Sequence, residues 1–321
     1  MHTWTVQEGR EHLSLLAQVS RWYYLDGLSQ DEIGKKVCLS RSRISRLLSE
    51  ARRRKIVRFV IGHPLERAMA LEESLCSRFG LRDARVAQCG EGMSPLTAVA
   101  TTAAEVLVDL CRQATVLATS SGTTLSAVVE QLPHQTLHDL CVVQMIGALS
   151  KDSPVTDSPD VTRRIAERFG ATYRLMPAPL LVGSPRLAQA LRREESVANA
   201  LALASHADVA IVGIGALDRA GISGPIFQGW LTPAECDYLA GLGAVGHISG
   251  HHFDANGRHI HATLCERVMA VPLDRLRSID QVVAVAAGTE KARAIQGALR
   301  GGYVDLLVTD TVTAQAVLAL P

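Results

Sequence analysis

At 321 residues, with 47% hydrophobic residues, the chain can hold one large domain or two of ordinary size around a sizeable core. No apolar run approaches the roughly 20 residues of a membrane span, and seven scattered cysteines without a CxxC pair argue against a disulfide framework. The net charge of +1 hides an asymmetry, because residues 1–60 hold 12 Lys and Arg against 6 Asp and Glu. This split predicts a small basic module, which attracts phosphate, joined to a larger acidic one. A start too polar for a signal peptide, together with thiols that read as reduced, predicts a cytoplasmic protein.

The first expected elements are two helices separated by the pair Asp26-Gly27. Apolar residues at helical spacing predict the first helix, and these are Leu15, Leu16, Val19, Trp22 and Tyr23. Ser29 and Glu32 then have the spacing of a capping box, which predicts that Ser29 begins a short helix. That helix is expected to bury Ile33 and Val37.

A third helix is expected after the turn "CLS", with Ser40 as its N-cap. Its apolar spacing predicts burial of Ile44, Leu47, Leu48 and Ala51. Its other face carries Arg41, Ser42, Arg43, Ser45, Arg46 and Ser49. Two short helices joined by a tight turn, the second with an Arg and Ser face, predict a helix-turn-helix that binds double-stranded operator DNA. The alternative is a solvated cationic helix face.

The segment "RRRKIVRFVI" (52–61) is expected to form a basic corner and then a strand of a wing. Arginine can bind guanine edges through two hydrogen bonds, and Arg and Ser also reach phosphates. We therefore expect Arg52, Arg53, Arg54 and Lys55 to contact the DNA backbone.

The remaining chain alternates apolar runs with helical stretches after an expected connecting helix at 65–81. Continuously apolar strands separated by helices predict a doubly wound, mostly parallel α/β sheet. The expected strands are 115–119, 141–147, 171–178, 208–215, 267–273, 282–288 and 305–310. We therefore expect a DNA-binding domain at 1–62 and an effector and oligomerisation domain at 63–321, with ligands at the carboxyl ends of strands.

Two expected strand-to-helix turns carry residues that suit an anion. In "SSGTT" (120–124), a glycine permits close backbone approach, and hydroxyl and N–H groups can hold phosphate oxygens; the candidates are Ser121, Gly122, Thr123 and Thr124. In "GTEK" (288–291), Lys291 adds a point charge. Ordinary helix capping explains either turn alone. Two such turns behind a DNA-binding module favour a sensor of a phosphorylated small molecule.

The chain resembles the SorC family of bacterial sugar-responsive transcriptional regulators over nearly its whole length. The resemblance is carried, in order, by "YYLDGLSQDEIGKKVCLSRSRISRLLSEARRRKIV", "SSGTTLSAVVEQL", "DVAIVGIGALD", "GAVGHISGHHFDANG" and "GTEKARAIQGALRGGYVDLLVTD". It implies an N-terminal winged helix-turn-helix and a larger effector domain related in fold to glucosamine-phosphate and ribose-phosphate isomerases. It also implies a tetramer that controls a sugar or polyol catabolic operon in response to a phosphorylated sugar.

By the same resemblance, Gly122, Thr123 and Thr124 would hold the phosphate, and Glu290 and Lys291 would line the same pocket. The sequence departs from the family at two positions. Ile146, in "VQMIGALS", stands where relatives often carry Lys or Arg, so no covalent adduct or second cation is expected there. His247 stands where relatives carry an acid that contacts sugar hydroxyls, which suggests a polyol or a more anionic ligand.

Five histidines lie close together in the sequence, at 247, 251, 252, 259 and 261. Imidazole is the commonest zinc ligand, but no Cys or Glu completes an obvious tetrahedral set, so we expect neither a metal site nor a cofactor. A hairpin around Asn256-Gly257 is expected instead, with "HHFDANG" bordering the effector pocket. Asp254 either faces that pocket or begins the turn.

Two other functions are compatible with the sequence. The effector domain could be an isomerase or deaminase of sugar phosphates with an appended DNA-binding module, with Glu290 and His247 as its acid–base pair. A DNA-binding protein that senses redox state through Cys38 is the third hypothesis. Because a basic module gives an isomerase no benefit, and an apolar turn residue explains Cys38, we expect a regulator that is not an enzyme.

Overall fold

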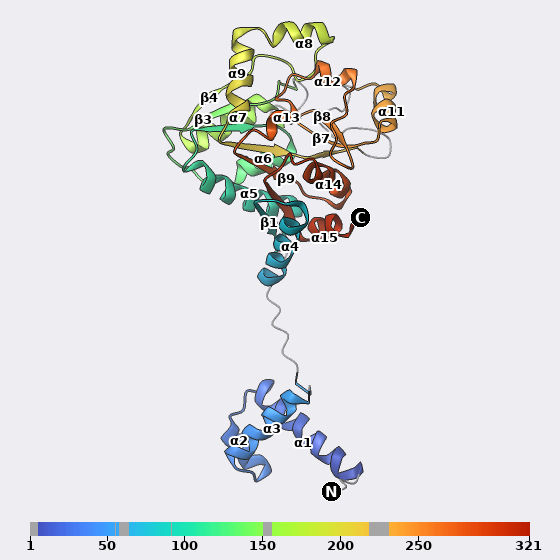
Figure 1. Cartoon of the computed structure of the whole chain (residues 1–321). Coiled ribbons are helices and arrows are strands. Elements are labelled where there is room, and N and C mark those ends of the chain that lie inside the picture. Colours follow the sequence, from blue (N-terminus) through green and yellow to red (C-terminus); the bar gives the residue numbers. More distant parts are fainter. Residues whose placement is uncertain (1–5, 55, 58–63, 91, 150–155, 218–230) are drawn as a thin grey trace. The chain divides into compact units, whose positions relative to one another are not determined.

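The computed structural model describes residues 6–54, 56–57, 64–90, 92–149, 156–217 and 231–321. The chain divides into two compact units, residues 1–63 and residues 64–321 (Figure 1). The smaller unit is helical, and the larger contains both helices and strands.

The N-terminal unit consists of α1 (Val6–Tyr24), α2 (Gln30–Val37) and α3 (Arg41–Arg53). The predicted capping box is present, with Ser29 and Glu32 bonded reciprocally, and the Ser40 side chain accepts a hydrogen bond from the N–H group of Arg43. The three helices share one apolar core, made of Leu16, Val19, Ile33, Ile44, Leu47, Leu48 and Ala51. These contacts confirm the predicted helix-turn-helix packing.

The turn between α2 and α3 is tight enough to require a glycine in α2. A Cβ at Gly34 would lie 2.6 Å from the carbonyl oxygen of Leu39. Cys38 closes the turn with a φ of 55° and its side chain exposed. Of the predicted basic corner and wing strand, Ile56 and Val57 form a bend, and Lys55 and residues 58–61 lie outside the described residues.

The larger unit is built on a seven-stranded sheet in which every neighbouring pair is parallel, with the order β1-β10-β9-β5-β2-β3-β4. Six of the seven expected strands correspond to members of this sheet, whereas β1 was not expected. The strands are β1 (Asp83–Ala87), β2 (Val116–Thr119), β3 (Cys141–Gln144), β4 (Thr172–Arg174), β5 (Val209–Gly213), β9 (Gln281–Val285) and β10 (Leu306–Asp310).

Helices cover both faces of this sheet, which confirms the doubly wound α/β architecture. One buried cluster contains residues of α4 (Pro64–Phe79), α9 (Glu195–Ser205), α14 (Ala292–Arg300) and α15 (Thr311–Ala319). The other contains residues of α5 (Pro95–Cys111), α6 (Thr123–Gln131) and α7 (Ser158–Phe169). Adjacent strand residues face opposite clusters, as Leu117 and Ala118 do in β2.

A second, antiparallel sheet of three strands was not expected from the sequence. It joins β6 (Gly215–Ala216), β7 (Ala244–Ile248) and β8 (His251–Asp254). The shorter helices are α8 (Pro185–Leu191), α11 (Pro233–Gly241), α12 (Thr263–Arg267), α13 (Leu273–Leu276) and the 3-10 turn η2 (Thr289–Lys291). None of the described helices is long and apolar enough to cross a membrane.

The expected strand at 267–273 is wrong. Arg267 ends α12 and Leu273 begins α13, and the mostly buried residues between them make only isolated bridges, Val268 with Leu181 and Ala270 with Ile146. Pro272 lacks an N–H group and precedes α13, so a longer ladder is not available. The apolar residues of this segment therefore indicate that it is buried, and not that it forms a strand of the sheet.

Candidate functional site

The polar face of α3 is exposed as predicted. Arg41, Ser42, Arg43, Ser45 and Arg46 are all exposed, and so are Arg52, Arg53 and Arg54 at the end of the helix. Two of these arginines pair with carboxylates: Arg41 lies 3.7 Å from Asp31, and Arg54 lies 2.8 Å from Glu50. Among the described residues, no ion pair involves Arg46 or Arg53. Their guanidinium groups are therefore available to DNA.

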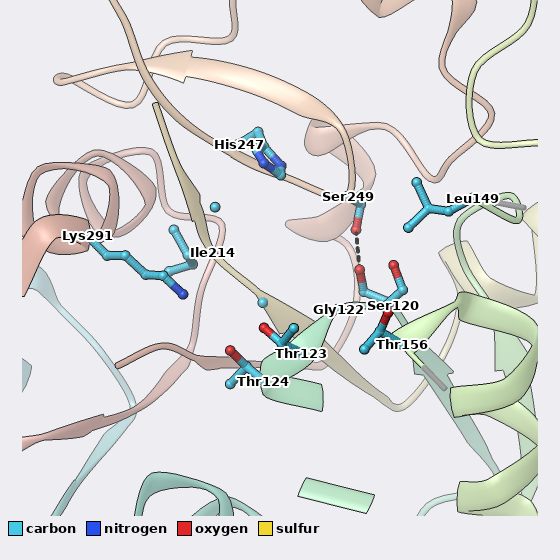
Figure 2. Close-up of a pocket in the computed structure, with 13 residues that line it drawn as sticks. Ser120, Gly122, Thr123, Thr124, Leu149, Thr156, Ile214, His247, Ser249 and Lys291 are labelled. Carbon is cyan, nitrogen blue, oxygen red and sulfur yellow. Dashed lines mark hydrogen bonds between the residues drawn. The ribbon is translucent and has the colours of Figure 1, made fainter. Parts of the chain in front are cut away.

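A pocket in the larger unit lies at the carboxyl ends of β2 and β5, the edge at which doubly wound sheets bind ligands. Figure 2 shows hydroxyl groups, one imidazole and one amino group around it. Its lining consists of Ser120, Ser121, Gly122, Thr123, Thr124, Leu149, Thr156, Gly213, Ile214, Gly215, His247, Ser249 and Lys291.

The N-terminus of α6 forms one wall of this pocket. Gly122 is its N-cap, and no side chain caps the helix there. The N–H group of Gly122 donates to the carbonyl of Thr156 at 3.0 Å, while the N–H groups of the following residues have no acceptor within the helix. Ser121 Oγ is buried without a hydrogen-bond partner. The wall thus offers donors that suit the oxygens of an anionic ligand.

Gly122 has a backbone conformation that favours glycine, with a φ of 116°. No protein atom lies within 4 Å of the position that a Cβ would occupy. Since Gly122 lines the pocket, a side chain added here would meet a ligand at this wall rather than the protein.

Lys291 supplies the positive charge of the pocket. Its amino group points toward the threonines in the first turn of α6 (Figure 2). Burial lowers the pKa of Lys291, and the carboxylate of Glu290 opposes that effect. An amino group partly removed from water is stabilised by an anion, so the pocket favours a negatively charged ligand over a neutral one.

His247 forms another wall, opposite Gly215 in the pairing of β6 with β7. A Cβ at Gly215 would collide with the imidazole, so the glycine is what makes room for His247. Burial, with smaller contributions from Lys291 and His251, lowers the pKa of His247 to about 3. The imidazole is therefore neutral near neutral pH.

We accordingly expect the His247 side chain to contribute no pH dependence to ligand affinity between about pH 5.5 and 7.5, because its proton is lost well below that range. A change in affinity there would reflect the second ionisation of a phosphate ligand. Calorimetry of the parent and of His247→Asn should give parallel pH profiles. An affinity step lost only in the variant would contradict this expectation.

Six of the eight effector residues expected from the sequence line the pocket, and two do not. Asp254 instead organises the turn after β8, where its Oδ1 accepts hydrogen bonds from the N–H groups of Asn256 and Arg258. Glu290 is exposed in η2 and is not part of the described lining. Of the second anion turn, only Lys291 reaches the pocket, because the N–H group of Gly288 is bonded to Thr313.

Ile146 is fully buried in the apolar core and bridges Ala270, so it packs away from the ligand site. In the absence of a cation at this position, Lys291 is the single cationic side chain in the described lining.

Sequence reasoning missed other lining residues, among them Thr156 and Ser249. Ser249 Oγ donates to Ser120 Oγ at 3.3 Å, although 129 residues separate the two in the chain (Figure 2). Ser120 directly follows β2 and is the first residue of the predicted anion turn at 120–124, although it was not among the four candidates named there. Thr156 and Ser249 reach the pocket through tertiary contacts that no local pattern announces.

Each of the two units matches a known protein family. Residues 63–319 match the sugar-binding domain family (Sugar-bind), and residues 17–54 match region 4 of sigma-70. The transcriptional regulator LsrR of Klebsiella pneumoniae is 36% identical over 95% of this chain and 93% of its own length. The erythritol catabolism regulatory protein EryD of Brucella abortus is 28% identical, covering 96% and 97%. The crystal structure of the full-length sorbitol operon regulator SorC from Klebsiella pneumoniae matches with a TM-score of 0.74, at 28% identity, over 96% of this chain and 99% of that one.

Proposed function

The chain belongs to the SorC family of sugar-binding transcriptional regulators, and on that basis we propose that it controls a sugar or polyol catabolic operon in response to a phosphorylated effector. Its matched relatives are transcriptional regulators rather than isomerases, so the enzymatic alternative is set aside. We propose that it acts on operator DNA in the cytoplasm, because its matched relatives are transcriptional regulators of bacteria.

The proposal of a phosphorylated effector rests on one observation: Lys291 and the start of α6, which no side chain caps, line the same pocket. The lysine supplies charge, and the helix supplies oriented N–H donors and a favourable dipole. Hydroxyl groups of Ser120 and Ser249 and the neutral His247 offer polar contacts to the rest of a polyhydroxylated molecule.

A thermal-shift screen tests this proposal directly. Sugar phosphates and polyol phosphates should be compared with their unphosphorylated counterparts and with inorganic phosphate. A ligand at a hundred times its dissociation constant stabilises the protein by about 2.7 kcal/mol. Stabilisation by phosphorylated compounds alone supports the proposal, and stabilisation by unphosphorylated polyols alone contradicts its phosphate component. Operator binding with and without the selected compound then gives the sign of regulation.

We also propose that the protein is at least a dimer, and by family resemblance a tetramer assembled through the larger unit. One recognition helix reads half a site, and two related by a twofold axis read a palindrome. A fragment of residues 61–321 should therefore remain oligomeric in analytical sedimentation. A monomer at micromolar concentration would show that the larger unit does not assemble the protein.

A further inference from the structure

Three potential metal ligands converge behind the β7–β8 hairpin, outside the effector pocket. They are His251 at the start of β8, His259 after the following turn, and Cys265 in α12. One ligand atom from each lies within 4.8 Å of the other two. No spacing in the sequence joins Cys265 to the histidines, because it is the fold of the loop between β8 and α12 that brings the thiol next to them.

The ring nitrogens of the two histidines in this cluster have few hydrogen-bond partners. His251 is 4% exposed, and no group lies in good hydrogen-bonding geometry to either ring nitrogen, so the contact with the backbone of Ala270, which raises the pKa of His251, is at most a weak hydrogen bond to one of them. Nε2 of His259 is likewise buried without a partner. Burial lowers the pKa of both imidazoles. Neutral, buried imidazoles with free lone pairs are costly unless something binds them.

We propose that His251, His259 and Cys265 bind a thiophilic divalent cation, and that Zn²⁺ is the ion whose preferences they match. Imidazole and thiolate are both ligands of Zn²⁺, and zinc sites with three protein ligands leave the fourth position to water. The same donor set also binds copper, so the test has to distinguish the two metals. In a tetrahedral site the ligand atoms lie about 3.3–3.7 Å apart, so the three side chains, whose ligand atoms lie within 4.8 Å of one another, need to close by at most about 1.5 Å. Cys265 Sγ now donates to the carbonyl of Ile260 at 3.0 Å, and must turn away from it to bind as a thiolate.

The surroundings allow an ion to enter and partly balance its charge. His259 lines a surface hollow together with His261 and Asp274, which gives a route from solvent. Asp274 raises the pKa of His259 and favours a cation, whereas Arg192 lies near enough to His251 to oppose one. Three arginines, Arg258, Arg277 and Arg300, also line this hollow and oppose a cation, so the negative charge that balances the ion has to come from the thiolate of Cys265 and from Asp274.

A metal here would fix the hairpin that shapes the effector pocket. His251 pairs with Ile248 across the hairpin, beside Ser249, and β7 also carries His247. The ion would therefore tie β8 to α12, which Arg192 already holds by donating to the carbonyls of Glu266 and Val268. The metal site does not depend on the phosphorylated effector, so either proposal can fail without the other.

The experiment uses the full chain, purified without metal-affinity chromatography and freed of metal with a chelator. Zn²⁺ should bind one ion per chain in calorimetry, with a dissociation constant below about 1 μM. Co²⁺ in its place should give the thiolate charge-transfer absorption and intense visible bands of a tetrahedral site. Loss of a direct ligand, in Cys265→Ser or His259→Ala, should weaken Zn²⁺ binding by more than the roughly 10- to 100-fold expected for an outer-sphere partner.

Cys236→Ser is the matched control, because Cys236 is 6% exposed and Cys265 is 7% exposed, but Cys236 lies outside the cluster. It should retain parent affinity and the parent cobalt spectrum. His259→Ala tests a half-buried position, so the proposal remains testable if Cys265→Ser fails to fold. The proposal would be overturned if the parent did not bind Zn²⁺ at micromolar concentration. It would also be overturned if both ligand variants bound Zn²⁺ as tightly as the parent, or if Cys236→Ser lost as much Zn²⁺ affinity as they did.

Discussion

Replacing Lys291 by alanine should weaken binding of the cognate phosphorylated effector by roughly ten- to hundred-fold. The amino group is partly buried in the pocket, so a charge-assisted hydrogen bond to phosphate is worth about 1.5–3 kcal/mol there. Arg293→Ala is the matched control, since it removes a positive charge two residues after Lys291, from the exposed side of α14 and outside the pocket. Operator binding without effector should survive both changes.

Gly122→Val should also weaken effector binding, but by filling the pocket rather than by removing a charge. The added side chain would project into the pocket, where no protein atom lies within 4 Å of its Cβ, and it would also strain a backbone with φ of 116°. Gly80→Val controls for strain, because Gly80 also has a positive φ and open space around it but is not part of the described lining. The effector response should be lost in Gly122→Val and kept in Gly80→Val.

Calorimetry with the effector found by the thermal screen provides the measurement. If Lys291→Ala and the parent bound the effector with equal affinity, Lys291 would not contact the phosphate of the ligand. Equal loss in Gly122→Val and Gly80→Val would show that strain, rather than steric exclusion of the ligand, explains the first variant.

The sequence predicted those parts of the site that depend on local chemistry. Gly122 and Thr124 were identifiable because a buried strand followed by Gly and Thr at a helix start is a pattern of a few adjacent residues. The capping box of Ser29 and Glu32 was identifiable for the same reason. These features are set by backbone hydrogen bonding within one or two turns.

The parts that sequence reasoning missed depend on distant contacts. Asp254 was compatible with either a turn or a ligand contact, and the hydrogen bonds that decide for the turn come from the backbone that follows it. Ser249 meets Ser120 only because β7 and β8 fold over the end of the parallel sheet. The same fold removes His247 from water, so its charge state is set by burial that no neighbouring residue in the sequence reveals.

Arg46→Ala should reduce affinity for the operator by roughly 5- to 150-fold and relax specificity at one base pair. Arg46 is exposed on α3, on the face opposite the buried Ile44, Leu47 and Leu48. From that face a guanidinium can bind guanine through two hydrogen bonds, a contact worth about 1–3 kcal/mol. Binding to random DNA should change much less, because phosphate contacts dominate it.

Arg53→Ala should behave differently, although it also removes one exposed arginine from α3. Arg53 lies in the last turn, where we expect a phosphate contact, so its loss should weaken binding to all sequences and reduce the salt slope by about 1. Arg112→Ala, at an exposed position in the larger unit, controls for net charge. Fluorescence anisotropy with operator and random duplexes over a range of salt separates the two arginines. If Arg46→Ala bound both duplexes as tightly as the parent, α3 would not read the operator through this face, because the loss of a base contact has to discriminate between sequences.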